Sequence, residues 1–228
     1  MPSPRWHSCT TVAELRRQAM ERIRAAAAAA IGERGAFHVV LAGGETPRAV
    51  YEALAEQGSE WGKWWVWFGD ERCLPADDPA RNSEMARASL LGRVGIPPAQ
   101  VRVIPGELGP RAAAADYGRQ LDGAPEFDLV LLGLGEDAHT ASLFPGADWG
   151  ESPAAPAALA VEAAPKPPAG RVSLAAWRLS RTRSALFLVA GAGKRAALRA
   201  WRNGERVPAA AVRPPAGADV LVERCCLE

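Results

Sequence analysis

The chain has 228 residues, a formal net charge of +1 at neutral pH and 48% hydrophobic residues. This length suffices for one domain, residues 1–228, around a sizeable core, while the near-zero charge argues against nucleic acid or an anionic membrane as a partner. No apolar stretch has the length of a membrane span or the character of a signal peptide, so we expect a cytoplasmic protein.

The first third of the chain alternates a predicted helix with predicted strands. Thr11 and Glu14 form a capping box that opens a helix with an apolar face as far as Ala30. Residues 37–41 read as a buried strand, and residues 61–68 are a tryptophan-rich run prone to form another. Stacking of these tryptophans on nucleic-acid bases is the alternative, but the interleaved basic residues that it requires are absent.

The alternation continues through the middle of the chain. Residues 82–91 and residues 111–121 have helical spacing, and residues 101–104 between them read as a strand. Residues 127–132 are an apolar run with the composition of a buried strand. Each of these segments adds one strand or one helix to the same alternating pattern.

The last third begins with residues 151–170, a stretch rich in proline and alanine that we expect to be a loop. Residues 171–177 and 185–191 read as two further strands, residues 194–201 as a helix and residues 220–222 as a last strand. Alternating strands and helices predict an α/β, Rossmann-like fold, a mostly parallel sheet with helices on both faces.

The most informative segment follows the apolar run and reads GLGEDAHTASLFPG, from Gly133 to Gly146. A buried strand that breaks at Gly-x-Gly places Asp137 and His139 at the carboxyl edge of the sheet, where α/β proteins present their chemistry. Histidine is the side chain best suited to proton transfer near neutral pH. A structural histidine beside a glycine turn is the alternative, but the neighbouring aspartate and glycines favour a catalytic site.

This segment resembles the signature of the 6-phosphogluconolactonases, which reads approximately GxGxDGHTASLFPG. Ala138 stands where that family usually has glycine, and a positive φ there would strain alanine by about 1 kcal/mol. The resemblance implies a deaminase/lactonase-type fold and hydrolysis of 6-phosphoglucono-1,5-lactone to 6-phosphogluconate in the pentose phosphate pathway. It implies a small sugar-phosphate lactone as the binding partner and calls for neither a metal nor a cofactor.

A glycine-rich loop after the first predicted strand reads AGGETP. The backbone N–H groups of Gly43 and Gly44 can approach an anion closely, and Thr46 adds a hydroxyl. An ordinary tight turn would also explain these residues, but the loop resembles the SGGSTP loop of the lactonase and glucosamine-6-phosphate deaminase superfamily. Glu45 would repel a phosphate, so we expect its side chain to turn outward or to pair with a cation such as Arg48.

The tryptophan-rich run ends in a charged segment that resembles the DERxxP segment of the lactonases. Arg72 carries a forked donor suited to a phosphate or an oxyanion. An internal ion pair among Asp70, Glu71 and Arg72 is the alternative. Asn82 and Ser83 follow where the family has Ser-Asn, in inverted order, and we therefore leave both out of the predicted site.

Two later segments add cations. Arg171 begins a run, RVSL, that resembles the RITL strand of the family, although a side chain at the start of a strand could equally be exposed. Lys194 ends the run GAGK, which matches the GxxK strand-to-helix turn of the family. At the start of a helix this lysine is placed to meet an anion, with a solvated surface lysine as the alternative.

The resemblance implies a division of labour among these residues. His139 would act as the general base on water, and Asp137 would either orient the imidazole or bind a sugar hydroxyl. The phosphate and ring oxygens would be held by Gly43, Gly44, Thr46, Arg72, Arg171 and Lys194.

The four cysteines lack the spacing of a metal site, and the last two, Cys225 and Cys226, are adjacent and unsuitable for an ordinary disulfide. We expect free thiols in a reducing compartment, and either a monomer or a small homo-oligomer.

Two other functions compete with the lactonase. An amino-sugar phosphate deaminase–isomerase would share the fold, but that family usually continues its DGH motif with IAFNEP and has a tyrosine in place of Arg72. This chain has TASLFP after His139. A non-catalytic sugar-phosphate sensor would carry a DNA-binding helix-turn-helix, and too few residues precede the first predicted core strand to build one.

Overall fold

The computed structural model describes residues 2–228, and a seven-stranded sheet forms its centre. In spatial order the strands are β1 (Arg5–Cys9), β10 (Ala218–Glu223), β9 (Ala185–Val189), β6 (Leu129–Gly133), β2 (Phe37–Leu41), β3 (Trp64–Phe68) and β5 (Val101–Arg102). All neighbouring pairs run parallel. The expected α/β fold with a mostly parallel sheet is therefore confirmed.

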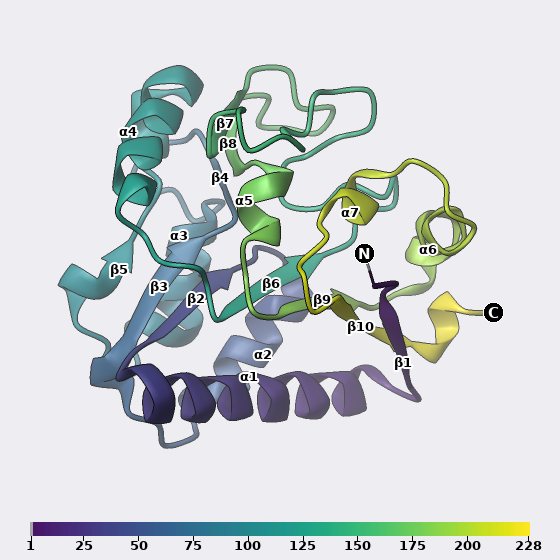
Figure 1. Ribbon diagram of the computed structural model, residues 1–228, viewed down its shortest axis with the longest axis horizontal. Coiled ribbons are helices and arrows are strands. Elements are labelled where there is room, and N and C mark those ends of the chain that lie inside the picture. The colour runs from purple at the N-terminus through teal and green to yellow at the C-terminus, as the bar shows by residue number, and fades with distance from the viewer. Residues whose placement is uncertain (1) are drawn as a thin grey trace.

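Helices lie on both sides of this sheet. They are α1 (Val12–Arg34), α2 (Glu45–Ala55), α3 (Asn82–Ala86), α4 (Pro110–Asp122), α5 (Ala176–Ser180), α6 (Arg195–Arg202) and α7 (Pro208–Ala211). Short helical turns are η1 (Trp61–Lys63), η2 (Arg87–Leu91), η3 (Pro98–Gln100), η4 (Gly106–Leu108), η5 (Ala192–Lys194) and η6 (Arg224–Cys226). Figure 1 shows α1 running across one face of the sheet, with α4 and α5 on the other side. Among residues 2–228, no helix combines the length and apolar character needed to cross a membrane.

A second, three-stranded sheet corrects the prediction for the last third of the chain. It consists of β4 (Asp70–Arg72), β8 (Arg171–Leu174) and β7 (Ala158–Val161), paired antiparallel in that order. The segment 151–170 thus contains a strand, and the predicted strand 171–177 is shorter and continues into α5. Only nine residues separate β7 from β8, too few for the crossover that parallel pairing requires.

Other elements also differ from the prediction. The prediction lacks β1, because its short sequence has no strand pattern. Arg5 holds this strand in place, since it donates to Asp219 of β10 at 3.0 and 2.7 Å. β5 contains only two of the four residues expected at 101–104. The predicted helix 82–91 is α-helical only to Ala86 and then widens into the π-helical turn η2.

The first helix forms where its sequence predicts it. The Thr11 hydroxyl accepts a hydrogen bond from the Glu14 N–H at 3.1 Å, which satisfies one of the free donors at the helix start. Gly35 ends the helix with φ of 76°, a left-handed conformation that glycine adopts without strain. Between these caps the buried face, Leu15, Ala19, Ile23, Ala27, Ala30 and Ile31, packs toward the sheet.

The strand order places a switch point between β2 and β6. From β2 the chain continues through α2 to β3, toward one edge of the sheet, whereas β9, the next strand of the sheet after β6, lies toward the other edge. Loops that leave two adjacent parallel strands in opposite directions diverge and leave a crevice at the carboxyl ends of those strands. The loops after β2 and β6 are the two glycine-rich segments of the sequence.

Two buried tyrosines support the strand ends that lead into this crevice. The Tyr51 hydroxyl accepts from the Ala42 N–H and donates to the Ala42 carbonyl, both at 2.9 Å. The Tyr117 hydroxyl makes the same pair of bonds to Phe68, at 2.9 and 3.1 Å. Burial raises the pKa of both phenols, so they stay protonated and can donate. Each hydroxyl thus pairs both backbone groups of a residue at the end of a strand.

Removal of either hydroxyl should destabilise the fold. In Tyr51→Phe and Tyr117→Phe a buried N–H and a buried carbonyl lose their partner, which costs about 1–3 kcal/mol. Urea unfolding followed by tryptophan fluorescence measures the change. The control Ser152→Ala removes an exposed hydroxyl and should stay within about 0.5 kcal/mol of the parent. Tyrosine variants as stable as this control would contradict the role given to the two phenols.

Candidate active site

A cavity of about 230 Å³ lies at the switch point. Its walls come from five separate segments: Ala42, Gly43 and Gly44 after β2; Asp70 and Arg72 of β4 with Asn82 of α3; Gly133, Leu134, Gly135, Glu136, His139, Thr140 and Ala141 after β6; Lys166 and Arg171; and Lys194. A larger cavity, about 870 Å³, lies beside α4 and β7, but alanines and the outer surface of α4 line most of it. Six of the eight predicted site residues line the smaller, more polar cavity: Gly43, Gly44, Arg72, His139, Arg171 and Lys194.

His139 and Asp137 form a hydrogen-bonded pair at the edge of this cavity. The distance from His139 Nδ1 to Asp137 Oδ1 is 2.5 Å. A carboxylate only accepts, so Nδ1 is the donor in this hydrogen bond, and in the neutral imidazole Nε2 then carries the lone pair. Burial acts to raise the pKa of Asp137, but the hydrogen bond and charge of His139 outweigh it and hold that pKa below its ordinary value. Asp137 itself is not among the residues that line the cavity.

The backbone of the loop after β6 brings the imidazole into position. The Gly135 N–H donates to the His139 carbonyl at 2.7 Å, which closes the turn. A Cβ atom on Gly135 would lie 2.0 Å from His139 Nδ1, so only glycine fits beneath the ring. Ala138 has φ of 64° and is buried. The positive φ considered from the sequence is therefore present, at a strain of about 1–2 kcal/mol.

The loop after β2 forms a second wall. Gly44 has φ of 105° and precedes α2, whose first backbone N–H groups have no partner within the helix. A Cβ atom on Gly43 would lie 2.0 Å from Asn82 Oδ1, which makes glycine necessary at that position. Thr46 lies in the first turn of α2 but does not line the cavity. Glu45 is 83% exposed and pairs with Arg48, as expected.

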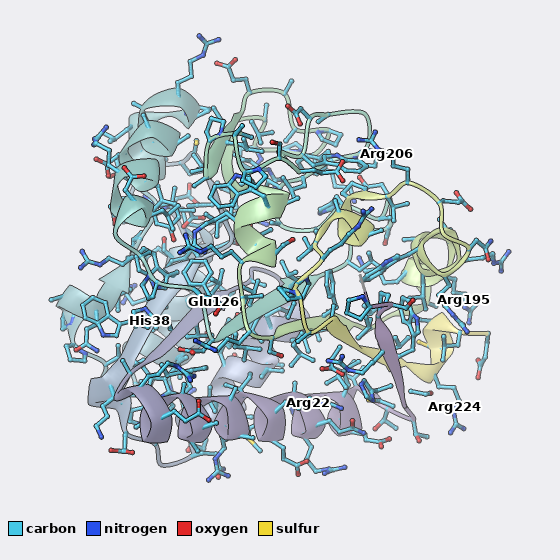
Figure 2. The ribbon with its side chains drawn as sticks, viewed as in Figure 1. Arg22, His38, Glu126, Arg195, Arg206 and Arg224 are labelled. Atoms are coloured by element: carbon cyan, nitrogen blue, oxygen red, sulfur yellow. The ribbon has the colours of Figure 1, made fainter. Side chains whose placement is uncertain are left out.

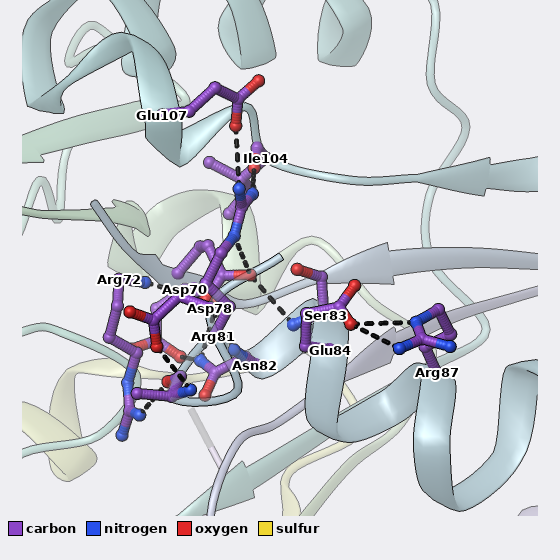
Figure 3. Close-up of polar contacts among 12 residues, drawn as sticks. Asp70, Arg72, Asp78, Arg81, Asn82, Ser83, Glu84, Arg87, Ile104 and Glu107 are labelled. Atoms are coloured by element: carbon purple, nitrogen blue, oxygen red, sulfur yellow. Dashed lines mark hydrogen bonds and ion pairs between the residues drawn. The ribbon is translucent and has the colours of Figure 1, made fainter. Parts of the chain in front are cut away.

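The predicted site omits the start of α3, but the structure places Asn82, its first residue, in the cavity wall. Asn82 donates through Nδ2 to the Asp70 carboxylate at 3.0 Å and to the Asp70 carbonyl at 2.9 Å (Figure 3). The other Asp70 oxygen accepts from the Ser142 hydroxyl at 2.6 Å. Asp70 thus connects the start of α3 with the loop that carries His139. The Asp-Glu-Arg motif marked Asp70, but nothing local in the sequence brings Asn82 beside it.

Glu71 does not form the ion pair with Arg72 that was the alternative interpretation of this segment. Its side chain is fully buried and accepts from the N–H groups of Asn82 and Ser83, at 2.6 and 2.9 Å, so that it caps α3. Its charged partner is Arg81, 2% exposed and 3.4 Å away, rather than Arg72. Arg81 also donates to the Ile104 carbonyl and to Glu107 (Figure 3). Glu71 therefore has a structural role, and Arg72, which does not pair with it, lines the cavity.

Arg72 and Arg171 face each other across the small sheet, as directly paired residues of β4 and β8. Arg72 donates from one Nη to the Ala80 carbonyl, and its buried Nε has no partner among residues 2–228. Arg171 is 6% exposed, which excludes the alternative of a solvated side chain. Burial lowers the pKa of the Arg171 guanidinium. The Asp70 carboxylate opposes this shift, and the positive charge of Arg72 adds to it. Two like charges at this position favour an anion between them.

Two lysines complete the positive wall. Lys194 ends the turn η5, and α6 begins one residue later, at Arg195, rather than at Lys194 as predicted. Lys166, which sequence reasoning missed, lines the cavity because Arg171 donates to the carbonyls of residues 166, 167 and 168 at 3.0 to 3.2 Å. Within residues 2–228 no carboxylate lies within ion-pair distance of either lysine. Beside Arg72 and Arg171, the cavity therefore presents two lysines without such an ion pair, and the carboxylates of Asp70 and Glu136 also line it.

Known proteins resemble this chain in sequence and in structure. The family described as glucosamine-6-phosphate isomerases/6-phosphogluconolactonase matches residues 10–221. The chain is 40% identical over 179 residues to the 6-phosphogluconolactonase of Synechocystis sp., which covers 74% of this chain and 72% of that protein. It is 38% identical over 211 residues to the 6-phosphogluconolactonase of Mycobacterium tuberculosis, with 83% of each chain covered.

Solved structures agree. A 6-phosphogluconolactonase from Thermotoga maritima superposes with a TM-score of 0.89 at 28% identity, over 97% of this chain and 100% of that chain. A monomeric glucosamine-6-phosphate deaminase superposes with a TM-score of 0.82 at 22% identity, over 97% of this chain and 98% of that chain, which shows a common fold alone. From the family match and the sequence identities together, the chain belongs to the glucosamine-6-phosphate isomerase/6-phosphogluconolactonase family.

Proposed function

We propose that this protein hydrolyses 6-phosphoglucono-1,5-lactone to 6-phosphogluconate, with His139 as the general base. One observation carries the proposal: a histidine whose Nδ1 is hydrogen-bonded to Asp137 lines a cavity that four cationic side chains also line, Arg72, Lys166, Arg171 and Lys194. The family relatives named as 6-phosphogluconolactonases support the same reaction. The substrate combines a lactone carbonyl, which needs an activated water, with a phosphate, which needs cations.

The reaction begins with water between His139 Nε2 and the lactone carbonyl. Nε2 takes a proton from the water as its oxygen attacks the carbonyl carbon, and Asp137 stabilises the imidazolium that forms. Collapse of the tetrahedral oxyanion breaks the bond to the ring oxygen. The imidazolium returns its proton to that oxygen, so the products are a hydroxyl and a carboxylic acid, which ionises. In this role Asp137 is a positioning residue, because its contact is with the imidazole.

The phosphate is proposed to lie against the positive wall of the cavity. Arg72, Arg171, Lys166 and Lys194 line that wall, and charge-assisted hydrogen bonds from such groups are the strong ones. The N–H groups of the loop after β2 and the start of α2 add a partial positive charge. Thr46, which does not line the cavity, is proposed only to support this loop.

The segment after His139 favours lactone hydrolysis over amino-sugar deamination. The Thr140 hydroxyl donates to the Gly133 carbonyl at 2.9 Å, and the Ser142 hydroxyl is bound to Asp70. Both side chains therefore brace the loop, and residues 140–145 contain no carboxylate to assist the opening of an amino-sugar ring. The assay that separates the two activities compares the lactone with glucosamine 6-phosphate as substrates of the same preparation.

Replacement of the base should abolish most of the turnover. For His139→Asn we expect kcat to fall about 10²- to 10⁴-fold, because general-base catalysis contributes a factor of this size. Binding of 6-phosphogluconate should stay unchanged, since the cations are intact. Lactone disappearance above the spontaneous rate, with product affinity from calorimetry, measures both. A folded wild-type protein that does not accelerate lactone hydrolysis would overturn the proposed function.

Asp137→Asn tests whether Asp137 acts through the imidazole. The amide can donate to Nδ1, which moves the ring proton to Nε2 and removes the base, so kcat should fall steeply while KM changes little. Asp122→Asn, at an exposed residue of α4, removes the same charge far from the cavity and serves as the control. An increase in KM with an unchanged kcat would instead assign Asp137 to the binding of a sugar hydroxyl.

The chain has three lysines, which allows a matched test of the phosphate contact. Lys194→Ala and Lys166→Ala should each raise KM for the phosphorylated lactone by about 10- to 100-fold, the loss of one charged hydrogen bond. Hydrolysis of unphosphorylated glucono-1,5-lactone should change little. Lys63→Ala, which removes an exposed lysine paired with Glu60, is the control. Equal losses on both lactones would show that the lysines do not bind phosphate.

A further inference from the structure

The carboxyl end of β10 carries a cluster of metal-ligating groups that the proposed reaction does not use. A carboxylate oxygen of Glu223 and the sulfur atoms of Cys225 and Cys226 all lie within 4.8 Å of one another. A tetrahedral Zn²⁺ ion with bonds of about 2.0–2.3 Å needs its ligand atoms about 3.3–3.8 Å apart. The three ligand atoms therefore have to move closer together for an ion to bind.

The two cysteines form no disulfide. Both are free thiols, and the Cα atoms of adjacent residues are about 3.8 Å apart, closer than an ordinary disulfide permits. Thiolate sulfur selects soft, thiophilic ions, and a carboxylate completes a three-ligand set of the kind that such ions accept with water as the fourth ligand. The spacing of the four cysteines alone predicts no metal site, because the third ligand here is a carboxylate, Glu223, rather than another cysteine.

The surroundings of Cys226 provide a route from solvent together with positive charge. Cys226 is buried, but it lines a cavity of about 240 Å³, which Glu223 and Cys225 do not line. Three arginines share this cavity with it: Arg195, Arg199 and Arg202. The chain terminus and Arg195 lie on the same side of the molecule (Figures 1 and 2). Two thiolates and a carboxylate would carry three negative charges against the two of the ion. Arg195, which donates to the Cys225 carbonyl at 2.6 Å, offsets the remaining charge.

We propose that Glu223, Cys225 and Cys226 bind one thiophilic divalent ion of the Zn²⁺ and Cd²⁺ class. On binding, each thiol releases its proton, so one ion replaces two protons and no electron is transferred. Two sulfur–metal bonds and one oxygen–metal bond form. The protons pass to the buffer, which provides a readout of the stoichiometry that is independent of catalysis.

The same groups hold the turn that carries Lys194. Glu223 accepts from the Gly191 N–H at 2.8 Å, and the Cys226 thiol donates to the Gly191 carbonyl at 3.2 Å. That carbonyl also accepts from the Lys194 N–H at 3.0 Å. An ion bound by Cys226 would replace the thiol proton, so the Cys226 hydrogen bond to the Gly191 carbonyl would be lost. The metal would therefore loosen the Lys194 turn and weaken phosphate binding, a consequence that rests on the proposed function.

The binding site is tested with Cd²⁺ on the intact protein. We expect one ion per chain, an ultraviolet sulfur-to-cadmium charge-transfer band, and two protons released in calorimetry across buffers of different ionisation enthalpy. Cys225→Ser and Glu223→Gln should each weaken binding at least tenfold. Cys73→Ser, which removes a half-buried thiol elsewhere, should bind as the wild type does. A missing band, or equal Cd²⁺ affinity in Cys225→Ser and Cys73→Ser, would overturn the site.

The coupling is tested by steady-state kinetics. Cd²⁺ should raise KM for the phosphorylated lactone in the wild type and in Cys73→Ser with little change in kcat, and it should have no effect in Cys225→Ser. Inhibition that persists in Cys225→Ser would overturn the coupling to Lys194. A protein that binds Cd²⁺ at this site but never hydrolyses the lactone would refute the proposed function alone, because the absorbance titration does not depend on turnover.

Discussion

The divergence of the chain at β2 and β6 is the constraint on which the candidate site depends. The two strands are parallel neighbours, and each ends in glycines because the loops must turn sharply away from each other. The resulting crevice exposes backbone N–H groups and the start of α2 to any ligand. Tyr51 binds both backbone groups of Ala42 after β2, and Tyr117 binds both backbone groups of Phe68 at the end of β3. The ends of these two strands are thus anchored to the core.

The alternation of side chains along β4 divides the three charged residues into two tasks. Successive residues of a strand point to opposite faces, so Asp70 and Arg72 both line the cavity while Glu71 points to the start of α3. A buried carboxylate is costly unless hydrogen bonds and a counter-charge surround it. Glu71 meets both conditions with the N–H groups of α3 and with Arg81. Its burial fixes β4, and with it the direction of Arg72.

The charges around the cavity are stabilised only partly by the protein itself. Arg171 donates three hydrogen bonds to the carbonyls of residues 166–168, which holds Lys166 in the cavity wall. Arg171 itself lies opposite Arg72 in the small sheet. The repulsion among these positive charges is unfavourable in the empty site, and an anion bound there would relieve it. Arg171 thus lines the cavity and also orders the segment 166–168 beside it.

The sequence by itself determined the features that depend on local interactions. The α/β alternation, the capped first helix, both glycine loops and the pairing of Asp137 with His139, two residues apart, follow from short-range periodicity and turn chemistry. The tertiary structure alone decided that Asn82 and Lys166 join the cavity wall, that β8 pairs antiparallel with β4, and that β1 closes the sheet through Arg5 and Asp219. These features depend on contacts between residues far apart in the chain, and no local pattern encodes such contacts because packing and burial of the whole fold select them.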